Sequence, residues 1–211
     1  MKRPDFYHSR SGNSLRAAIA LELCSIDSNR HFLDLEKKEQ KAPAYLHINP
    51  AGTVPSYVEY DEVGRQTMTL TQSGAILEYL LSKHRPDLIP SDLIDRSLAN
   101  SNVLAALSDI AVQNALMRYM SFHSGNEAFL RERLLESINA AFLPIRHTRF
   151  FGDSGPNIAD FAHFPVIFMR QQLICSTADT EHILAWLERM KSIHAVSRSI
   201  AYAGLQLPLN P

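Results

Sequence analysis

Hydrophobic and polar positions follow two different periods along the chain, and the change of period divides it into two parts. In the first 85 residues, short apolar runs bounded by polar residues predict strands, and two segments with a three- to four-residue repeat predict helices. Beyond residue 92 we find only the helical repeat. We therefore expect a small α/β domain over residues 1–85, a linker over 86–92 and an all-helical domain over 93–211.

The first part has the order strand–helix–strand, then strand–strand–helix. The expected elements are a strand at 5–8, a helix capped by Asn13 or Ser14, strands at 31–35, 55–60 and 66–70, and a helix from Gln72 to about His84. Residues 43–47 suggest a short irregular helix, and residues 61–64 a turn between the last two strands. A strand–helix–strand unit favours a parallel pair with a right-handed crossover. This order is that of the thioredoxin fold.

The second part begins after the two prolines of residues 85–90. The apolar repeats predict a long helix from Ile94 to about Phe122, a break at 124–126, helices at 129–145, from Asn157 and at 181–191, and an irregular tail from Leu205. Asn157 and Asp160 have the spacing of a capping box. Pro165 lies inside the third of these helices and is expected to kink it.

Composition and charge exclude some classes of protein but indicate no particular function. Hydrophobic residues make up 45% and charged residues 20%, which is ordinary for a globular protein, and a net charge of −1 gives no argument for nucleic-acid or membrane binding. We find neither a secretion signal nor an apolar run that could span a bilayer, so a cytoplasmic location is expected. The nine histidines lack metal-ligand spacing, so no metal is expected. Cys24 and Cys175 are expected to be buried free thiols.

Two motifs in the α/β part carry candidate chemistry. Residues 48–55 combine an Asn-Pro turn, a glycine and a proline that enters a strand, and Gln72-Ser73 opens an apolar helix. Each motif alone is equally consistent with a plain turn or a plain helix cap. Together, and in this order, they resemble the glutathione-binding half of the glutathione transferases. The resemblance implies a cis Val54–Pro55 bond, glutathione paired with the backbone beside it, and the γ-glutamyl carboxylate at Gln72 and Ser73.

The first loop and helix make the resemblance more specific. Residues 10–21 read Arg-Ser-Gly-Asn-Ser-Leu-Arg-Ala-Ala-Ile-Ala-Leu, similar to the zeta class, which includes maleylacetoacetate and maleylpyruvate isomerases. Ser11 stands where that class places its activating serine. A hydroxyl and helix N-terminal amides favour the thiolate of a thiol whose free pKa is about 8.5. The resemblance thus implies that Ser11 is the catalytic residue. Tyr7 is the rival candidate, although it is also consistent with a strand residue packed inward.

The resemblance also implies residues beside the cofactor and the substrate. Arg10 matches an arginine that holds substrate carboxylate in the isomerases, although a solvated loop charge is the plainer interpretation. Gln113 fits a Gln-Asn pair of the class, and Gln40 stands where several members have a histidine near glutathione.

Two positions depart from the isomerase pattern. The isomerases have a second substrate-binding arginine, and this chain has Gln171 or Gln172 at the matching position. The neighbouring Arg170 is the candidate to bind the substrate instead. A shift of one residue turns a helical side chain by about 100°, so Arg170 would point in a different direction. Residues 111–112 read Ala-Val where some isomerases carry His-Pro.

The function implied is that of a glutathione-dependent enzyme. It would activate the glutathione thiol for attack on a small hydrophobic or diacid electrophile, and the resemblance to the isomerases adds cis-trans isomerisation of an unsaturated diacid as a candidate reaction. The alternative is a non-catalytic relative that uses the same fold to bind a partner protein. The resemblance further implies a homodimer, and a monomer that buries its apolar helix faces internally is the other possibility.

Overall fold

The computed structural model describes residues 2–122 and 127–203. The predicted break at 124–126 and the predicted tail from Leu205 lie outside these residues. The chain forms two compact units. The first holds the residues up to Arg85 together with a segment that begins at Ala195, and the second runs from Pro86 to His194.

A four-stranded sheet with the order β2-β1-β3-β4 forms the centre of the first unit. The strands are β1 (Asp5–His8), β2 (Asn29–Phe32), β3 (Ser56–Tyr60) and β4 (Gln66–Leu70). β1 pairs with β2 in parallel, whereas β3 is antiparallel to β1 and β4. The second strand lies earlier than the predicted 31–35. It ends before Asp34 because that residue turns the chain, its backbone N–H bonding the Glu39 carboxylate at 2.8 Å.

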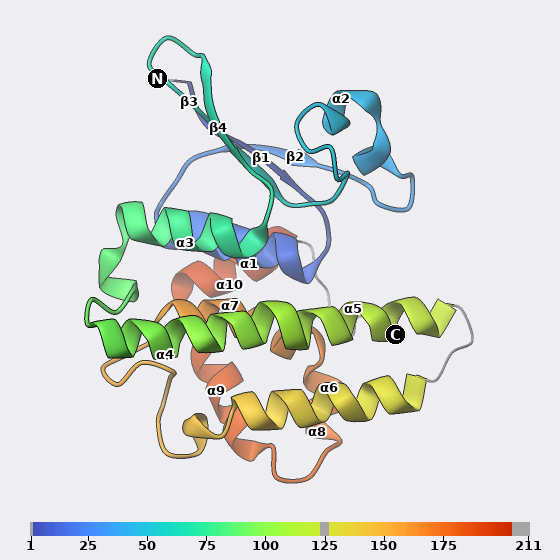
Figure 1. The fold of residues 1–211 in the computed structure, drawn as a ribbon, viewed down its shortest axis with the longest axis vertical. Helices are drawn as coiled ribbons and strands as arrows, with labels where there is room; N and C mark the ends of the chain where they lie inside the picture. The colour runs from blue at the N-terminus through green and yellow to red at the C-terminus, as the bar shows by residue number, and fades with distance from the viewer. Residues whose placement is uncertain (1, 123–126, 204–211) are drawn as a thin grey trace. The chain divides into compact units, whose positions relative to one another are not determined.

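Two helices, α1 (Gly12–Leu23) and α3 (Ser73–His84), lie side by side on one side of the sheet (Figure 1). Leu15, Ile19, Ile76 and Leu80 are buried where these helices pack. The short α2 (Pro43–Leu46) and a 3-10 turn, Glu39–Lys41, lie in the connection between β2 and β3. The prediction that Asn13 or Ser14 caps the first helix is wrong: the cap is Ser11, whose side chain accepts the backbone N–H of Ser14.

A helix near the C-terminus, α10 (His194–Ala203), completes the first unit and was not predicted. Arg198 on α10 forms an ion pair of 3.1 Å with Glu22 on α1. Glu22 also pairs with Arg30 at 2.6 Å, and the Arg30 guanidinium lies 3.5 Å from the centre of the Tyr202 ring. One carboxylate therefore joins α1, β2 and α10.

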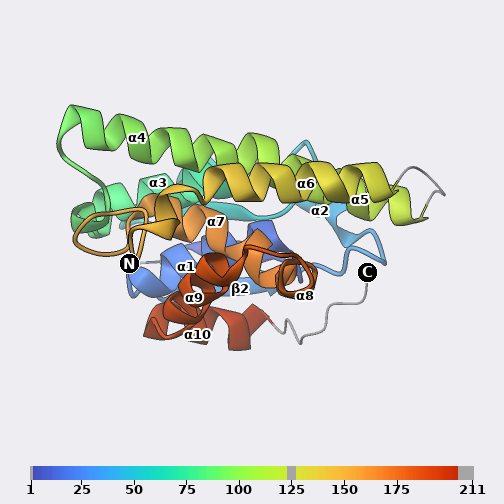
Figure 2. The same ribbon diagram turned by 90° about the horizontal axis from the view of Figure 1, so that it is seen from below.

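Every regular element in the described part of the second unit is a helix. Its longest feature is the run of α4 (Leu93–Leu104), a π-helical segment (Ala105–Ile110) and α5 (Ala111–Phe122), with α6 (Glu127–Ala141) beside it (Figure 2). The other helices are α7 (Ile158–Met169), α8 (Gln171–Cys175) and α9 (Glu181–Lys191). The predicted fold class, a thioredoxin-like sheet domain followed by a helical domain, is confirmed.

Helix α7 forms the core of the second unit, with residues 158–168 all buried and Pro165 inside a helix that continues past it. The predicted capping box is confirmed, since Asn157 accepts from the Ala159 N–H and the Asp160 carboxylate accepts from the Asn157 N–H. Asp160 also accepts from the indole of Trp186 at 2.7 Å. The polar start of α7 is thereby tied to α9.

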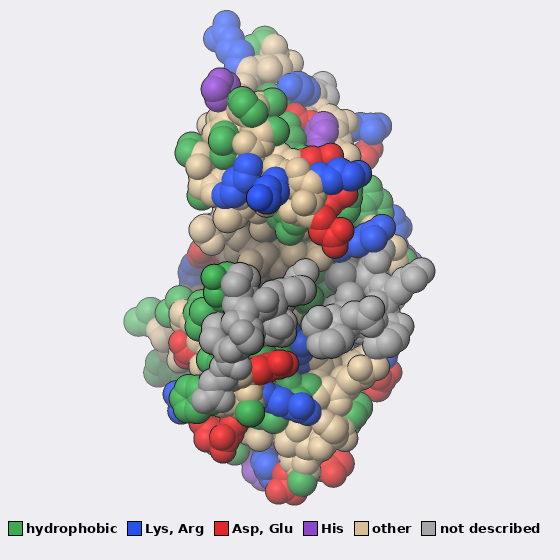
Figure 3. All heavy atoms as spheres, turned by 90° about the vertical axis from the view of Figure 1, so that its right-hand side faces the viewer, with side chains coloured by type: hydrophobic (Ala, Val, Ile, Leu, Met, Phe, Trp, Pro, Cys, Tyr) green, Lys and Arg blue, Asp and Glu red, His purple; other side chains and the backbone are tan. Residues whose placement is uncertain are grey.

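Surface features agree with the balanced composition. On the face drawn in Figure 3, acidic and basic side chains lie interspersed. Both cysteines are free, as expected, but Cys175 is exposed, so its predicted burial is wrong. Cys175 ends the short α8, which leaves its side chain at the surface. Among the described residues, no helix is both long and apolar enough to cross a membrane.

Candidate functional site

Three serine hydroxyls gather at the start of α1. The Ser11 Oγ lies 3.0 Å from the Ser14 Oγ and 3.2 Å from the Ser9 Oγ, and it accepts the Ser14 backbone N–H at 3.2 Å. Ser9 and Ser14 are buried, whereas Ser11 is half-buried. Ser11 is therefore partly exposed, and it lies at the N-terminus of a twelve-residue helix, where the helix dipole favours an anion.

Tyr7, the rival of Ser11, lies on β1 and is half-buried. Its ring stacks on His31 with centroids 4.5 Å apart and lies 5.5 Å from the Tyr45 ring. Burial, with the nearby Asp5 carboxylate, raises the pKa of Tyr7 above its ordinary value. The phenol is thus held neutral, and its aromatic contacts are those of a packed strand residue.

The Val54–Pro55 bond is cis, as the resemblance implied, and leads directly into β3. Side chains on the preceding loop hold this segment in place. The Tyr45 hydroxyl donates to the Thr53 carbonyl at 2.6 Å, and the Asn49 amide donates to the same oxygen at 2.7 Å. Pro55 is buried and Val54 is half-buried. Burial and the two hydrogen bonds to the Thr53 carbonyl therefore hold the backbone of this segment in place.

Gln40 lies in the 3-10 turn packed against this loop. Gly52 has a positive φ of 57°, and a Cβ built on it would lie 2.9 Å from the Gln40 carbonyl oxygen. Lys41 donates to the Ala51 carbonyl at 3.0 Å, which holds the turn and the loop together. The Gln40 side-chain oxygen is buried and accepts no hydrogen bond from the described residues.

The start of α3 places Ser73 and Gln72 at a second helix N-terminus. Gln72 is exposed and occupies the cap position without a side-chain capping bond, while Ser73 is the first helical residue and is buried. The Ser73 Oγ accepts a hydrogen bond of 2.9 Å from the guanidinium of Arg16, which also donates to Asn13 at 2.8 Å. Arg16 is fully buried, and its desolvation lowers its pKa to about 10. The sequence showed Arg16 only as part of the zeta-like pattern, although an arginine within the apolar run of residues 15–21 was a signal of its own.

The remaining candidates are distributed over both units. Arg10 is exposed in the first unit, with its guanidinium 5.8 Å from the centre of the Phe32 ring. In the second unit, Gln113 bonds Ser137 on α6 at 2.9 Å. Arg170 donates to the Asn114 side chain at 2.6 Å and lines a cavity of about 320 Å³. Its guanidinium is thus tied to α5.

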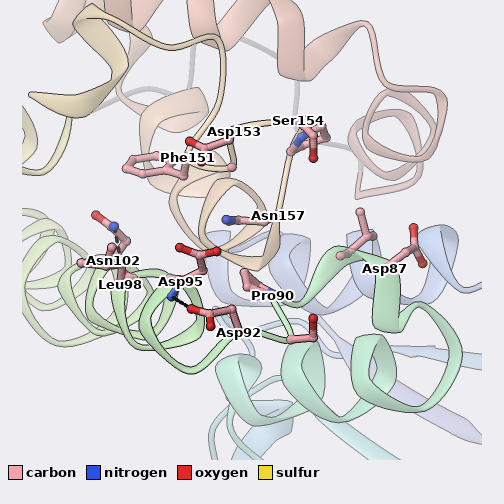
Figure 4. Close-up of a pocket in the computed structure, with 16 residues that line it drawn as sticks. Asp87, Pro90, Asp92, Asp95, Leu98, Asn102, Phe151, Asp153, Ser154 and Asn157 are labelled. Carbon is pink, nitrogen blue, oxygen red and sulfur yellow. Dashed lines mark hydrogen bonds between the residues drawn. The ribbon is translucent and has the colours of Figure 1, made fainter.

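A larger cavity, of about 540 Å³, lies within the second unit, between the start of α4 and the loop that precedes α7 (Figure 4). Its lining includes the carboxylates of Asp87, Asp92, Asp95 and Asp153 and none of the residues that the sequence pointed to for glutathione. Asp92 caps α4 by accepting the backbone N–H groups of Ile94 and Asp95. No group of three or more His, Cys, Asp or Glu side chains within the described ranges is arranged to hold a metal ion.

Comparison of the sequence and the structure with known proteins indicates which proteins this chain is similar to. Residues 5–82 match the model of the glutathione S-transferase N-terminal domain. Among curated relatives, the transcriptional regulator URE2 of Saccharomyces cerevisiae is 28% identical over 143 residues, which cover 65% of this chain and 40% of that protein. The chain thus spans less than half the length of this relative.

Solved structures show the same fold. A glutathione transferase from Pseudomonas putida, crystallised with glutathione disulfide, superposes with a TM-score of 0.83 at 16% identity, covering 96% of this chain and 92% of that one. The glutathione transferase URE2P6 from Phanerochaete chrysosporium, in complex with oxidised glutathione, gives a TM-score of 0.84 at 18% identity, covering 96% of both chains.

The chain therefore has the glutathione transferase fold, and its first part is similar to the glutathione S-transferase N-terminal domain. The family match covers residues 5–82, and the solved structures extend the likeness of fold to 96% of the chain. They do not single out the zeta class.

Proposed function

We propose that the chain is a glutathione-dependent enzyme that binds glutathione in its first unit and activates the thiol for attack on a small electrophile. The observation that carries the proposal is the presence in one compact unit of three elements suited to the tripeptide. These are the Ser11 hydroxyl at the start of α1, the fixed backbone at Val54 and Pro55, and the Ser73 hydroxyl at the start of α3. Fold neighbours crystallised with glutathione or its disulfide add support.

Each part of glutathione has a matching group. The γ-glutamyl carboxylate would bind at Gln72 and Ser73, because helix N-terminal amides and a hydroxyl donate to anions. The peptide would pair with the backbone at Val54 and Pro55, and Gln40, on the turn packed against that loop, is its proposed side-chain neighbour. The sulfur would face Ser11, whose hydroxyl would stabilise the thiolate by a hydrogen bond without acting as a nucleophile.

Calorimetric titration with reduced glutathione tests the binding directly. We expect a saturable site at or below millimolar concentration, weakened in Ser73→Ala, which removes one donor to the carboxylate. Gly64→Ala is a suitable control, because Gly64 lies in the exposed turn between β3 and β4 with no atom within 4 Å of a built Cβ. Absence of binding to the wild-type chain at millimolar glutathione would refute the proposal.

For the second substrate, we propose a small hydrophobic or diacid electrophile. Arg10 and Arg170 are the proposed partners of a substrate carboxylate, and Gln113 is a proposed neighbour of the substrate. A panel of chlorodinitrobenzene, dichloroacetate, a peroxide and maleylpyruvate would identify the reaction. Turnover of maleylpyruvate would assign the zeta-like isomerase activity, whereas turnover of chlorodinitrobenzene alone would assign conjugation.

The alternative is a non-catalytic protein that binds a macromolecular partner. The name of the relative URE2, a transcriptional regulator, is the observation that favours it. Glutathione binding without turnover of any substrate in the panel would support this alternative. Turnover that falls in Ser11→Ala would exclude it.

We further propose a homodimer in a reducing, cytoplasmic setting. The helices α4 and α5 expose several large apolar side chains, namely Ile94, Leu98, Leu104, Val112, Leu116 and Tyr119. Apolar exposure of this kind is typical of a surface that is covered in the assembled protein. Light scattering at micromolar concentration should give the dimer mass, and Leu98→Asp should shift it towards the monomer; a wild-type monomer would contradict the proposal.

A further inference from the structure

Arg16 is a charged residue in the interior of the first unit. Its side chain is fully buried on α1, among the apolar residues that pack against α3. Burying an ionised group is costly unless hydrogen bonds and charges compensate it. One nitrogen of its guanidinium donates both to Asn13 and to the Ser73 Oγ, which places the cation directly behind the first residue of α3.

The chemistry of arginine fixes the direction of the bond to Ser73. A guanidinium carries donors and no acceptor, so the Ser73 oxygen must accept from Arg16. The Ser73 hydroxyl proton is then left to point to another acceptor. Because Ser73 opens a twelve-residue helix, the N–H groups of the first turn and the positive end of the helix dipole lie beside that proton.

We propose that Arg16 is a positioning residue for the carboxylate of the ligand: its hydrogen bond to the Ser73 oxygen leaves the Ser73 proton directed to the ligand, and its guanidinium supplies a buried positive charge behind the site. The inference rests on the proposed binding of glutathione and goes further by naming the group that selects for the carboxylate. Arg16 does not touch the ligand. It acts through Ser73 and through its charge.

Carboxylate selectivity is the property to measure. The two ligands are glutathione and its analogue with 4-aminobutyrate in place of the γ-glutamyl residue, which lacks only the α-carboxylate. We expect the wild-type chain to prefer glutathione about tenfold or more, as for one or two hydrogen bonds to a charged group. Arg16→Gln should lose most of this preference, because glutamine is uncharged and its side-chain oxygen can accept the Ser73 proton. Arg16→Lys, still charged and donor-only, should keep part of it.

A purely structural role for Arg16 would lower both affinities by the same factor and leave the preference unchanged, which would overturn the inference. A wild-type chain that binds both ligands equally would overturn the inference and leave glutathione binding intact. A wild-type chain that binds neither ligand would overturn the proposed function and, with it, the role of Arg16.

If Arg16→Gln does not fold, a double-mutant cycle of Arg16→Lys and Ser73→Ala provides the test. Arg16→Lys should change the preference for glutathione over the analogue by a larger factor when Ser73 is present than in the Ser73→Ala background. The reason is that Arg16 acts on the carboxylate mainly through its hydrogen bond to the Ser73 hydroxyl. Equal factors in both backgrounds would show that the two residues act independently and would overturn the positioning role.

Discussion

Ser11 and Ser14 are joined twice at the start of α1: the Ser11 Oγ accepts the Ser14 backbone N–H at 3.2 Å and lies 3.0 Å from the Ser14 Oγ. The Ser14 Oγ in turn accepts the backbone N–H of Ser9, in a buried bond of 3.0 Å. Ser11 thus caps the helix, and Ser14 holds the strand end that precedes it. The two hydroxyls have separable roles, which mutation can distinguish.

For Ser11→Ala we expect turnover at neutral pH to fall about ten- to a hundredfold, because one charge-assisted hydrogen bond is worth roughly 1.5–3 kcal/mol. Glutathione affinity should change much less, since the bond is made mainly to the sulfur anion. Raising the pH should restore part of the rate as bulk base supplies thiolate. Steady-state kinetics against pH measure this, with Tyr7→Phe as the matched control. A damaging Tyr7→Phe beside a silent Ser11→Ala would reverse the assignment.

For Ser14→Ala we expect a loss of stability of about 1–3 kcal/mol, because the buried Ser9 N–H is left without its acceptor. Ser14→Thr keeps the hydroxyl and should cost less. Urea unfolding at neutral pH measures both variants. If Ser14→Ala is as stable as the wild type, the Ser9 N–H must find another acceptor and the structural role of Ser14 is wrong.

Gly52 and Gly64 form a natural pair of test positions, since both have positive φ, 57° and 80°. Alanine at either position carries the backbone strain of a left-handed conformation, about 1 kcal/mol. At Gly52 the new Cβ would also lie 2.9 Å from the Gln40 carbonyl oxygen and 2.7 Å from the Lys41 Nζ, whereas at Gly64 it meets nothing within 4 Å. We therefore expect Gly52→Ala to be the more destabilising by at least about 1 kcal/mol and to weaken glutathione binding. Equal losses in urea unfolding would show that the turn beside Gly52 adapts freely.

Asp160 accepts hydrogen bonds from the Asn157 and Phe151 backbone and from the Trp186 indole. Asp160→Asn replaces one acceptor oxygen with a donor that faces these N–H groups, and we expect a loss of about 2–4 kcal/mol. Trp186 is the single tryptophan, so its fluorescence reports the change directly. Asn157→Ser, which replaces the capping amide oxygen with a hydroxyl oxygen that can also accept, should cost less than about 1 kcal/mol. A stable Asp160→Asn with unchanged fluorescence would contradict this.

The sequence predicted the fold class because its signals were local. Apolar periodicity and prolines placed most elements, and the spacing of Asn157 and Asp160 predicted a cap that the structure contains. The first helix cap was assigned to Asn13 or Ser14 because all four residues from Ser11 onward are good cap or turn formers, and only the backbone conformation decides among them. The partnership of Arg16 with Ser73 spans 57 residues. No local pattern encodes such a contact: the apolar run of residues 15–21 indicates that Arg16 is buried but does not identify its partner.

We expect the protonation of His8 to contribute to the pH dependence of the free energy of unfolding. This side chain is buried on β1, its ring contacts the Phe6 and Phe32 rings, and its charged form is disfavoured by the charges of Arg30 and His31 on the neighbouring strand β2. Burial, reinforced by these two neighbours, lowers its pKa from 6.5 to about 4. The neutral form is therefore preferred in the folded state, so the contribution is fully present above pH 6.5 and is lost as the pH falls from there towards 4.

We expect His8 to account for about 1–3 kcal/mol of lost stability on acidification, after allowance for its partial solvation. Asp160 opposes this trend, because burial raises its pKa to about 6 and its contribution is lost as the pH rises through that value. His8→Phe keeps the ring contacts and removes the titration. Urea midpoints at pH 7.5 and 5.0 should therefore differ less in His8→Phe than in the wild type. If the midpoints at pH 7.5 and 5.0 differ as much in His8→Phe as in the wild type, the pKa of His8 is not lowered on folding, and the prediction is wrong.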